Sequence, residues 1–111
     1  KTSKATQDKH KKRDSTSKSS TDVFNLDTFA HADFRAARYI VAMSKGTDFH
    51  STEIMLIHDG TTVSLTQYGV LQDATLASFD ADINGANVRL RCTPASATTT
   101  TIKFDRTLVE A

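Results

Sequence analysis

From Val23 to its end, the chain is divided into short runs rich in β-branched and aromatic residues, separated by residues that favour turns. This pattern is typical of antiparallel strands joined by tight connections. The turn signals are residues 44–48 (SKGTD), 58–60 (HDG), 84–85 (NG) and 93–96 (TPAS). The sequence therefore predicts that residues 23–111 form an all-β domain, an antiparallel β-sandwich of about seven to eight strands with a jelly-roll or Ig-like arrangement.

Two of the expected strands, residues 38–44 and 52–58, carry apolar side chains on both of their faces. Such strands are expected at the centre of a sheet, covered on both sides. Residues 62–66 instead alternate apolar and polar, as expected for a strand with one wet face, and Asp59–Gly60 should close a tight hairpin before them. In the one window that could be helical, residues 26–37, the apolar residues keep no 3.6-residue period, so the window can hold a short helical turn but no long helix is expected there.

Another clear strand has two arginines on one face. Val88, Leu90 and Cys92 should point one way, whereas Arg89 and Arg91 should point the other. Because the two arginines should project together from one sheet face, they are candidate contacts for a partner protein.

Charge divides the chain at residue 22. Residues 1–22 hold seven basic and three acidic side chains, a net charge of +4, whereas residues 23–111 hold seven basic and ten acidic ones, a net charge of −3. The first segment has no aliphatic or aromatic residue larger than alanine, so an arm or linker that is disordered on its own is expected. Lys11, Lys12 and Arg13 form its basic cluster and are candidate docking contacts for an acidic partner. A solvated linker is the alternative interpretation, and nucleic acid is a disfavoured partner because no aromatic residue is interleaved for base stacking.

Several features bear on where the protein works. Cys92 is the only cysteine, so an intrachain disulfide and a cysteine-based zinc site are both excluded, and a reducing compartment is indicated. No apolar run is long enough for a membrane helix and no secretory signal is evident, which favours a soluble protein made in the cytoplasm. Since the chain begins with Lys1, we expect it to be a segment of a longer or processed polypeptide.

One segment resembles the start of a calcium-binding loop. Asp80, Asp82 and Asn84 provide oxygen ligands at the first, third and fifth positions, and Gly85 stands at the sixth. The twelfth position, which should be glutamate, is Arg91, a cation. A type I′ hairpin turn at Asn84–Gly85 accounts for the same residues, so no metal site is predicted.

Catalytic signatures are lacking. The four histidines, His10, His31, His50 and His58, have no zinc-like spacing, and no phosphate-binding glycine loop or nucleophile motif occurs. The sequence therefore predicts no catalytic residue, no cofactor and a protein that is not an enzyme.

Three segments carry a resemblance to a known class of domain. Residues 34–41 (FRAARYIV), 53–62 (EIMLIHDGTT) and 79–90 (FDADINGANVRL), in this order and spacing, resemble a β-rich domain of virion structural proteins from marine tailed phages, notably those that infect cyanobacteria. The closing residues 93–107 are similar to the end of that domain, and the resemblance extends over residues 27–109.

The resemblance implies a β-rich module of a tail, fibre, baseplate or capsid-surface protein. The expected function is that of a structural or assembly module of a virion, and the expected partners are identical copies and other virion proteins, with no membrane. The alternatives are a receptor- or carbohydrate-binding tip domain of a tail fibre, for which a host receptor would be the partner, and a capsid decoration protein.

Overall fold

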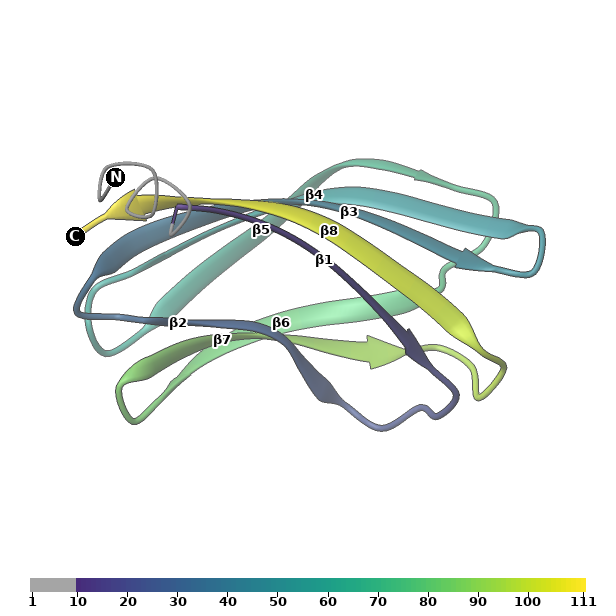
Figure 1. The fold of residues 1–111 in the computed structure, drawn as a ribbon, viewed down its shortest axis with the longest axis horizontal. Coiled ribbons are helices and arrows are strands. Elements are labelled where there is room, and N and C mark those ends of the chain that lie inside the picture. Colours follow the sequence, from purple (N-terminus) through teal and green to yellow (C-terminus); the bar gives the residue numbers. More distant parts are fainter. Residues whose placement is uncertain (1–9) are drawn as a thin grey trace, which may run out of the picture.

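The computed structural model describes residues 10–111, which form eight strands and no helix. The strands are β1 (Lys11–Lys18), β2 (Phe24–Ala30), β3 (Phe34–Lys45), β4 (Asp48–His58), β5 (Val63–Gln72), β6 (Ala77–Asn84), β7 (Asn87–Pro94) and β8 (Thr100–Glu110). They make a five-stranded sheet in the order β1-β8-β3-β4-β5 and a three-stranded sheet in the order β2-β7-β6. All pairings are antiparallel, and the two sheets lie one above the other (Figure 1). The predicted all-β sandwich is confirmed.

The connectivity is closer to a jelly roll than to an Ig fold. The first strand pairs with the last, and the second pairs with the seventh, so that the chain ends are nested within one another. Strands β3, β4 and β5 then follow one another as a meander within the larger sheet. No helix forms within residues 26–37, because β2 and β3 occupy that window. The turn at residues 31–33 joins them, and in it the Asp33 N–H donates to the Ala30 carbonyl at 3.2 Å.

Strand β1 lies inside the segment that the sequence assigns to a basic arm. Residues Lys11–Lys18 pair along their whole length with β8, from Lys11 opposite Thr107 to Lys18 opposite Thr100. Backbone hydrogen bonding to a neighbouring strand needs no apolar side chains, which is why composition alone does not reveal this strand. The expectation of a disordered arm over residues 1–22 is therefore wrong for Lys11–Lys18, and residues 1–9 lie outside the described part of the chain.

Glycines at positive φ close the two tightest hairpins. Gly46–Thr47 joins β3 to β4 and Gly85–Ala86 joins β6 to β7, with φ of 60° at Gly46 and 62° at Gly85. No other residue type among the described ones has positive φ, so only the first central residue of each turn does. This is the pattern of a type II′ turn. The expected type I′ turn with Asn84–Gly85 at its centre is therefore wrong in type and in position, because the central residues are Gly85 and Ala86. The register places Asn84 opposite Asn87, within the ladder.

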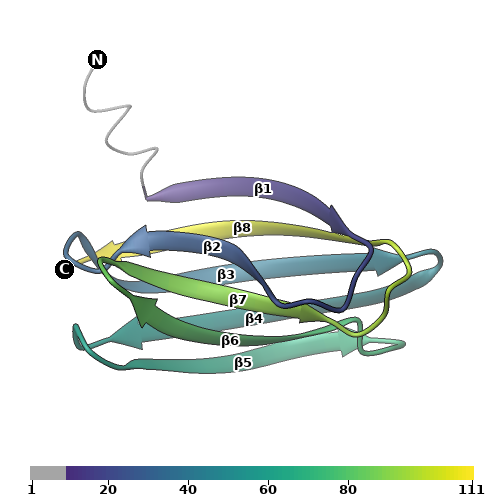
Figure 2. The ribbon, with the colours of Figure 1, turned by 90° about the horizontal axis from the view of Figure 1, so that it is seen from below.

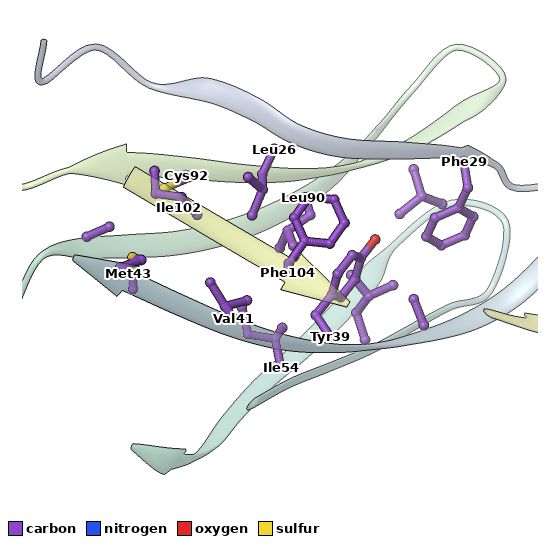
Figure 3. Close-up of a cluster of buried hydrophobic side chains, with 14 of the residues drawn as sticks. Leu26, Phe29, Tyr39, Val41, Met43, Ile54, Leu90, Cys92, Ile102 and Phe104 are labelled. Carbon is purple, nitrogen blue, oxygen red and sulfur yellow. The ribbon is translucent and has the colours of Figure 1, made fainter. Parts of the chain in front are cut away.

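The space between the sheets is filled by one apolar core (Figure 3). Its fully buried members come from both sheets and include Tyr39, Val41 and Ile54 from the larger sheet and Val88 and Leu90 from the smaller one. Inward positions alternate with exposed ones along β3, β4, β7 and β8, as the period of two requires. Cys92 belongs to this core, and burial raises the pKa of its thiol to about 12.

Candidate interaction surface

The basic cluster of the sequence is divided between two faces of β1. Arg13 points outward and its Nε lies 3.3 Å from the Asp105 carboxylate, with both side chains largely exposed. The Lys11 side chain is exposed on the same side, since it lies opposite Thr107. Lys12 points between the sheets, where its Nζ lies 2.9 Å from Asp27. The three cations therefore do not form one continuous patch.

Asp27 is a buried carboxylate that joins the two sheets. Arg106 Nη1 donates to both of its oxygens, at 3.2 and 3.0 Å, and the Tyr39 hydroxyl donates to Oδ2 at 2.8 Å. The Asp27 side chain has no exposed surface, and that of Arg106 is 9% exposed. Burial, together with the neighbouring carboxylate, raises the pKa of Tyr39 far above its usual range, so the phenol stays a hydrogen-bond donor.

A β-bulge in β2 places Asp27 in this position. The register of β2 against β7 shifts between Asn25 and Asp27, so that Leu26 and Asp27 are both buried although they follow one another in sequence. The sequence indicates one member of this cluster, because Arg106 alternates in phase with Ile102, Phe104 and Leu108 on the inward face of its strand. A buried arginine requires a partner. The partner, Asp27, could not be predicted, because the sequence pattern does not reveal the bulge that turns its side chain inward.

Arg89 and Arg91 project together from the outer face of the three-stranded sheet, next to two aspartates. Arg89 donates to both oxygens of Asp82, at 2.7 and 2.5 Å, and Arg91 donates to both oxygens of Asp80, at 2.9 and 3.2 Å. The hydrogen bonds that Arg89 donates lower the pKa of Asp82, and those that Arg91 donates to Asp80 raise the pKa of Arg91. This face is polar and its opposite charges are matched in pairs.

The two aspartates of the calcium-like segment are thus engaged by arginines. Across residues 10–111, no group of three or more histidine, cysteine, aspartate or glutamate side chains is arranged to hold a metal ion. The same residues contain no helix long and apolar enough to cross a membrane.

Two of the histidines fix loops from within the sandwich. His58 is buried, its Nε2 lies 2.6 Å from the Phe34 carbonyl and its Nδ1 accepts from the Gly60 N–H at 2.9 Å. His50, on the same face of β4, accepts the Leu76 N–H at 3.1 Å through Nδ1. Both rings hold the loops that follow β4 and β5, so their arrangement is structural.

The outer face of the five-stranded sheet exposes large apolar side chains. Ile40 is 49% exposed, Met55 47%, Ile57 53% and Val109 58%. The register puts Val109, Ile57 and Met55 near one another around Ala36, which lies between Val109 and Ile57. Ile40 lies farther along β3, beyond Arg38 and between Glu53 and Asp105. The prediction that the β3 and β4 segments are central in their sheet is confirmed, but the prediction that both of their faces are covered is wrong for the described residues. The three-stranded sheet covers one face alone (Figure 1).

Two parts of this outer face differ in charge. Near β1 and β8, a hollow of about 550 Å³ is bordered by Arg13, Lys103 and Asp105. Near β4 and β5, a hollow of about 330 Å³ is bordered by uncharged side chains, those of Ala36, Met55, Leu56, Ile57, Ser64, Leu65 and Thr66. The charged side chain nearest to this second hollow on β4 is Glu53, which accepts a 2.8 Å hydrogen bond from Arg38 that lowers the pKa of the carboxyl. We call the surface formed by Ala36, Ile40, Met55, Ile57 and Val109 the apolar face.

No protein-family model matches this chain, and no curated protein matches it. Among solved structures, the chain is similar to the tailspike protein of Acinetobacter baumannii phage AM24, with 11% identity and a TM-score of 0.47 over 96% of this chain and 27% of that one. It is also similar to the tailspike protein of Acinetobacter phage vB_ApiP_P1, with 18% identity and a TM-score of 0.49 over 93% and 23% of the two chains. A third is the tailspike protein gp49 of Acinetobacter baumannii bacteriophage Fri1, described as a capsular polysaccharide depolymerase, with 14% identity and a TM-score of 0.36 over 90% and 20%.

The chain thus spans roughly a quarter of the length of these phage proteins. The prediction that this protein is not an enzyme is corrected by the comparison, because one of the proteins to which it is similar is described as a depolymerase. No residue of this chain is assigned a catalytic role by it. None of the three phages is described as one that infects cyanobacteria, and that part of the resemblance stays a prediction.

Proposed function

We propose that this chain is an assembly module of a phage tail protein, and that its apolar face packs against a neighbouring subunit of the virion. Two observations suggest the class of protein. The segments at residues 34–41, 53–62 and 79–90 resemble domains of virion proteins, and the solved structures to which the chain is similar are those of phage tailspike proteins. The partners are identical copies or other virion proteins, and the location is the virion.

The observation that carries the proposal is the apolar face, because it lies on strands whose opposite side chains are buried in the core. Ile40, Met55 and Ile57 each expose about half of their surface although they lie on the central strands β3 and β4. Contiguous exposed apolar side chains on a soluble domain mark contact surfaces, because their burial against a partner is favourable. The sequence pattern of these strands is that of strands covered on both faces, which supports a cover supplied by another subunit.

The charged residues have a secondary part in this proposal. Lys11 and Arg13 border the outer face on the β1 side and can set the orientation of a partner with acidic groups. Arg89 and Arg91 lie on the opposite side of the sandwich with their charges already matched, so we assign them no more than a weak contact role there.

The test is incorporation of variant chains into virions. Replacing Ile57 with Lys puts a charge in the middle of the apolar face, and we expect incorporation to fall by about tenfold or more, because an unpaired charge would be buried. The matched control is Ser78→Lys, an exposed position of β6 on the other sheet, which should incorporate like the wild type. Equal incorporation of the two variants, with both folded by circular dichroism, would show that this face does not carry the assembly.

Two other experiments distinguish the alternative functions from tail assembly. A receptor- or carbohydrate-binding tip domain would bind host cells or their surface glycans as an isolated chain, and Ile57→Lys would leave that binding intact. A capsid decoration protein would be recovered with tailless heads. Either result would replace the tail-assembly proposal.

A further inference from the structure

Strand β5 is a free sheet edge that has no charged side chain and no proline. It is one of the two edges of the five-stranded sheet, and Figure 2 shows β5 and β1 along opposite margins of the domain. Among the described residues, the backbone of Val63–Gln72 pairs with β4 on one side, and no backbone hydrogen bond to another segment is made on the other side. An edge strand leaves every second pair of N–H and C=O groups available for a further strand.

The composition of the two edges differs sharply. Strand β5 reads VSLTQYGVLQ, ten residues without a single charged side chain or proline. Strand β1 reads KKRDSTSK, with four cations and one anion in eight residues. Charged residues on an edge are a common means of preventing unwanted strand addition. Hence charge protects β1, whereas residues 63–68 of β5, which precede its bulge, have no such protection.

The geometry points to a second copy of this chain as the occupant, with the β5 strands of two copies pairing antiparallel about a two-fold axis at Thr66. This deepens the proposed function, on which it rests, by naming identical copies as one class of neighbour. Residues opposite each other in an antiparallel pair lie on the same face, so each self-paired position must meet a residue an even number of positions away. With the axis at Thr66, Ser64 lies opposite Tyr68 and Leu65 lies opposite Gln67. All of these residues precede Gly69, where a β-bulge shifts the register of β5 against β4.

Charge argues for self-pairing at β5 and against it at β1. At β5 no like charges meet in any register, because the strand has none. The same operation on β1 puts Asp14 opposite Asp14 when the axis passes through that residue, and Lys12 opposite Lys18 when it passes through Ser15. Directly opposed like charges destabilise a strand pair.

Side chains beside the edge fit the same occupant. Tyr68 is 37% exposed, and the uncharged hollow bordered by Ser64, Leu65 and Thr66 lies directly beside this edge. The bulge at Gly69, where φ is 62° and the register against β4 shifts, ends the regular part of β5. The paired stretch therefore covers residues 64–68 in each copy.

Cysteine cross-linking of the whole 111-residue chain tests the pairing. Thr66→Cys would place two thiols opposite each other across the axis, at a Cβ separation of about 4.5 to 5.5 Å, from which a small shift of the two strands reaches the disulfide distance of about 4 Å. The natural Cys92 is fully buried and does not compete. Ser15→Cys is the matched control, since it is exposed on the same outer face but at the protected edge. We expect a disulfide-linked dimer from Thr66→Cys under mild oxidation and none from Ser15→Cys; dimers formed at equal rates by both variants, or by neither, would overturn the pairing.

A second measurement does not depend on a disulfide. By sedimentation velocity, we expect the wild-type chain to form dimers that Thr66→Lys weakens by about tenfold or more, while Ser15→Lys leaves them unchanged. A wild-type chain that stays monomeric at every concentration, or a Thr66→Lys chain that dimerises like the wild type, contradicts the inference. Incorporation of Ile57→Lys into virions is a separate readout, so the proposed function can fail or hold independently of this one.

Discussion

Asp27 shows how much of this fold depends on one side chain. Its carboxylate is fully buried and accepts hydrogen bonds from Arg106 and Tyr39, which come from the other sheet, and from Lys12 in β1. Such a cluster is expensive to dehydrate and is stable only while its members are satisfied together. The cluster therefore ties β1, β2, β3 and β8 into one arrangement.

We predict that Asp27→Ala lowers the free energy of unfolding by about 3 to 5 kcal/mol, because it leaves the guanidinium of Arg106 in an apolar setting without its carboxylate. Urea denaturation followed by circular dichroism measures this. Asp105→Ala removes an exposed carboxylate, beside Arg13, and should cost less than about 1 kcal/mol. If the two substitutions cost the same, the buried cluster does not have the role given to it.

The cluster also shows where sequence-based prediction reaches its limit at single residues. Alternation correctly puts Arg106 inward with Phe104 and Leu108, and it puts Arg89 and Arg91 outward together. It cannot supply Asp27, since the bulge near Asn25 makes two successive residues point inward. Nor does alternation tell that Lys12 turns inward while Lys11 and Arg13 do not, because the strand that contains them has no apolar residues to reveal its period.

Among the structural elements, the loop from β5 to β6 is held by side chains of β4 and its own aspartate. His50 Nδ1 accepts the Leu76 N–H, and Asp73 accepts the Phe49 N–H at 2.8 Å. His50 is buried, and desolvation lowers its pKa below the ordinary value. Because Nδ1 is the acceptor, the loop requires the neutral ring.

This gives a pH dependence with a definite sign. The unfolded chain takes up a proton on His50 more readily than the folded one, so the stabilising contribution is present above the ordinary histidine pKa of about 6.5 and is lost as the pH falls below it. We expect the urea midpoint to decrease between pH 7.5 and pH 5, and to decrease less in His50→Asn, whose side-chain oxygen can accept the same hydrogen bond without titrating. An identical decrease in both proteins would assign the pH dependence to other groups.

Most elements could be predicted from alternation and turn residues, and the exceptions have physical causes. The strands around residues 38–44, 52–58 and 88–92 form where expected. A hairpin also forms before β5, but a four-residue loop at residues 59–62 closes it in place of the expected tight turn at Asp59–Gly60. Strand β1 could not be predicted because it pairs with β8 along a polar edge and contains no apolar side chain that would reveal its period. The cover of the β3 and β4 strands could not be predicted either, since a pattern indicates that a face is buried but not by which chain.

For the whole molecule, the asymmetry between the outer faces is the feature with the clearest functional meaning. The three-stranded sheet presents matched pairs such as Arg89 with Asp82, which suit contact with solvent. The five-stranded sheet presents the apolar face and the uncharged edge of β5. A domain with one solvent face and one apolar face is suited to occupy a fixed position in an assembly.

The most direct test of this account uses the two methionines of the chain. Met55 lies on the apolar face and is 47% exposed, whereas Met43 is in the core and is 3% exposed. Peroxide converts accessible methionines to the sulfoxide, so mass spectrometry of the two peptides reports whether Met55 is covered, with Met43 as the internal reference. We predict rapid oxidation of Met55 in the free chain and protection of Met55 to the level of Met43 in the assembled virion. Equally rapid oxidation of Met55 in both states would contradict the central claim that the apolar face is a subunit contact.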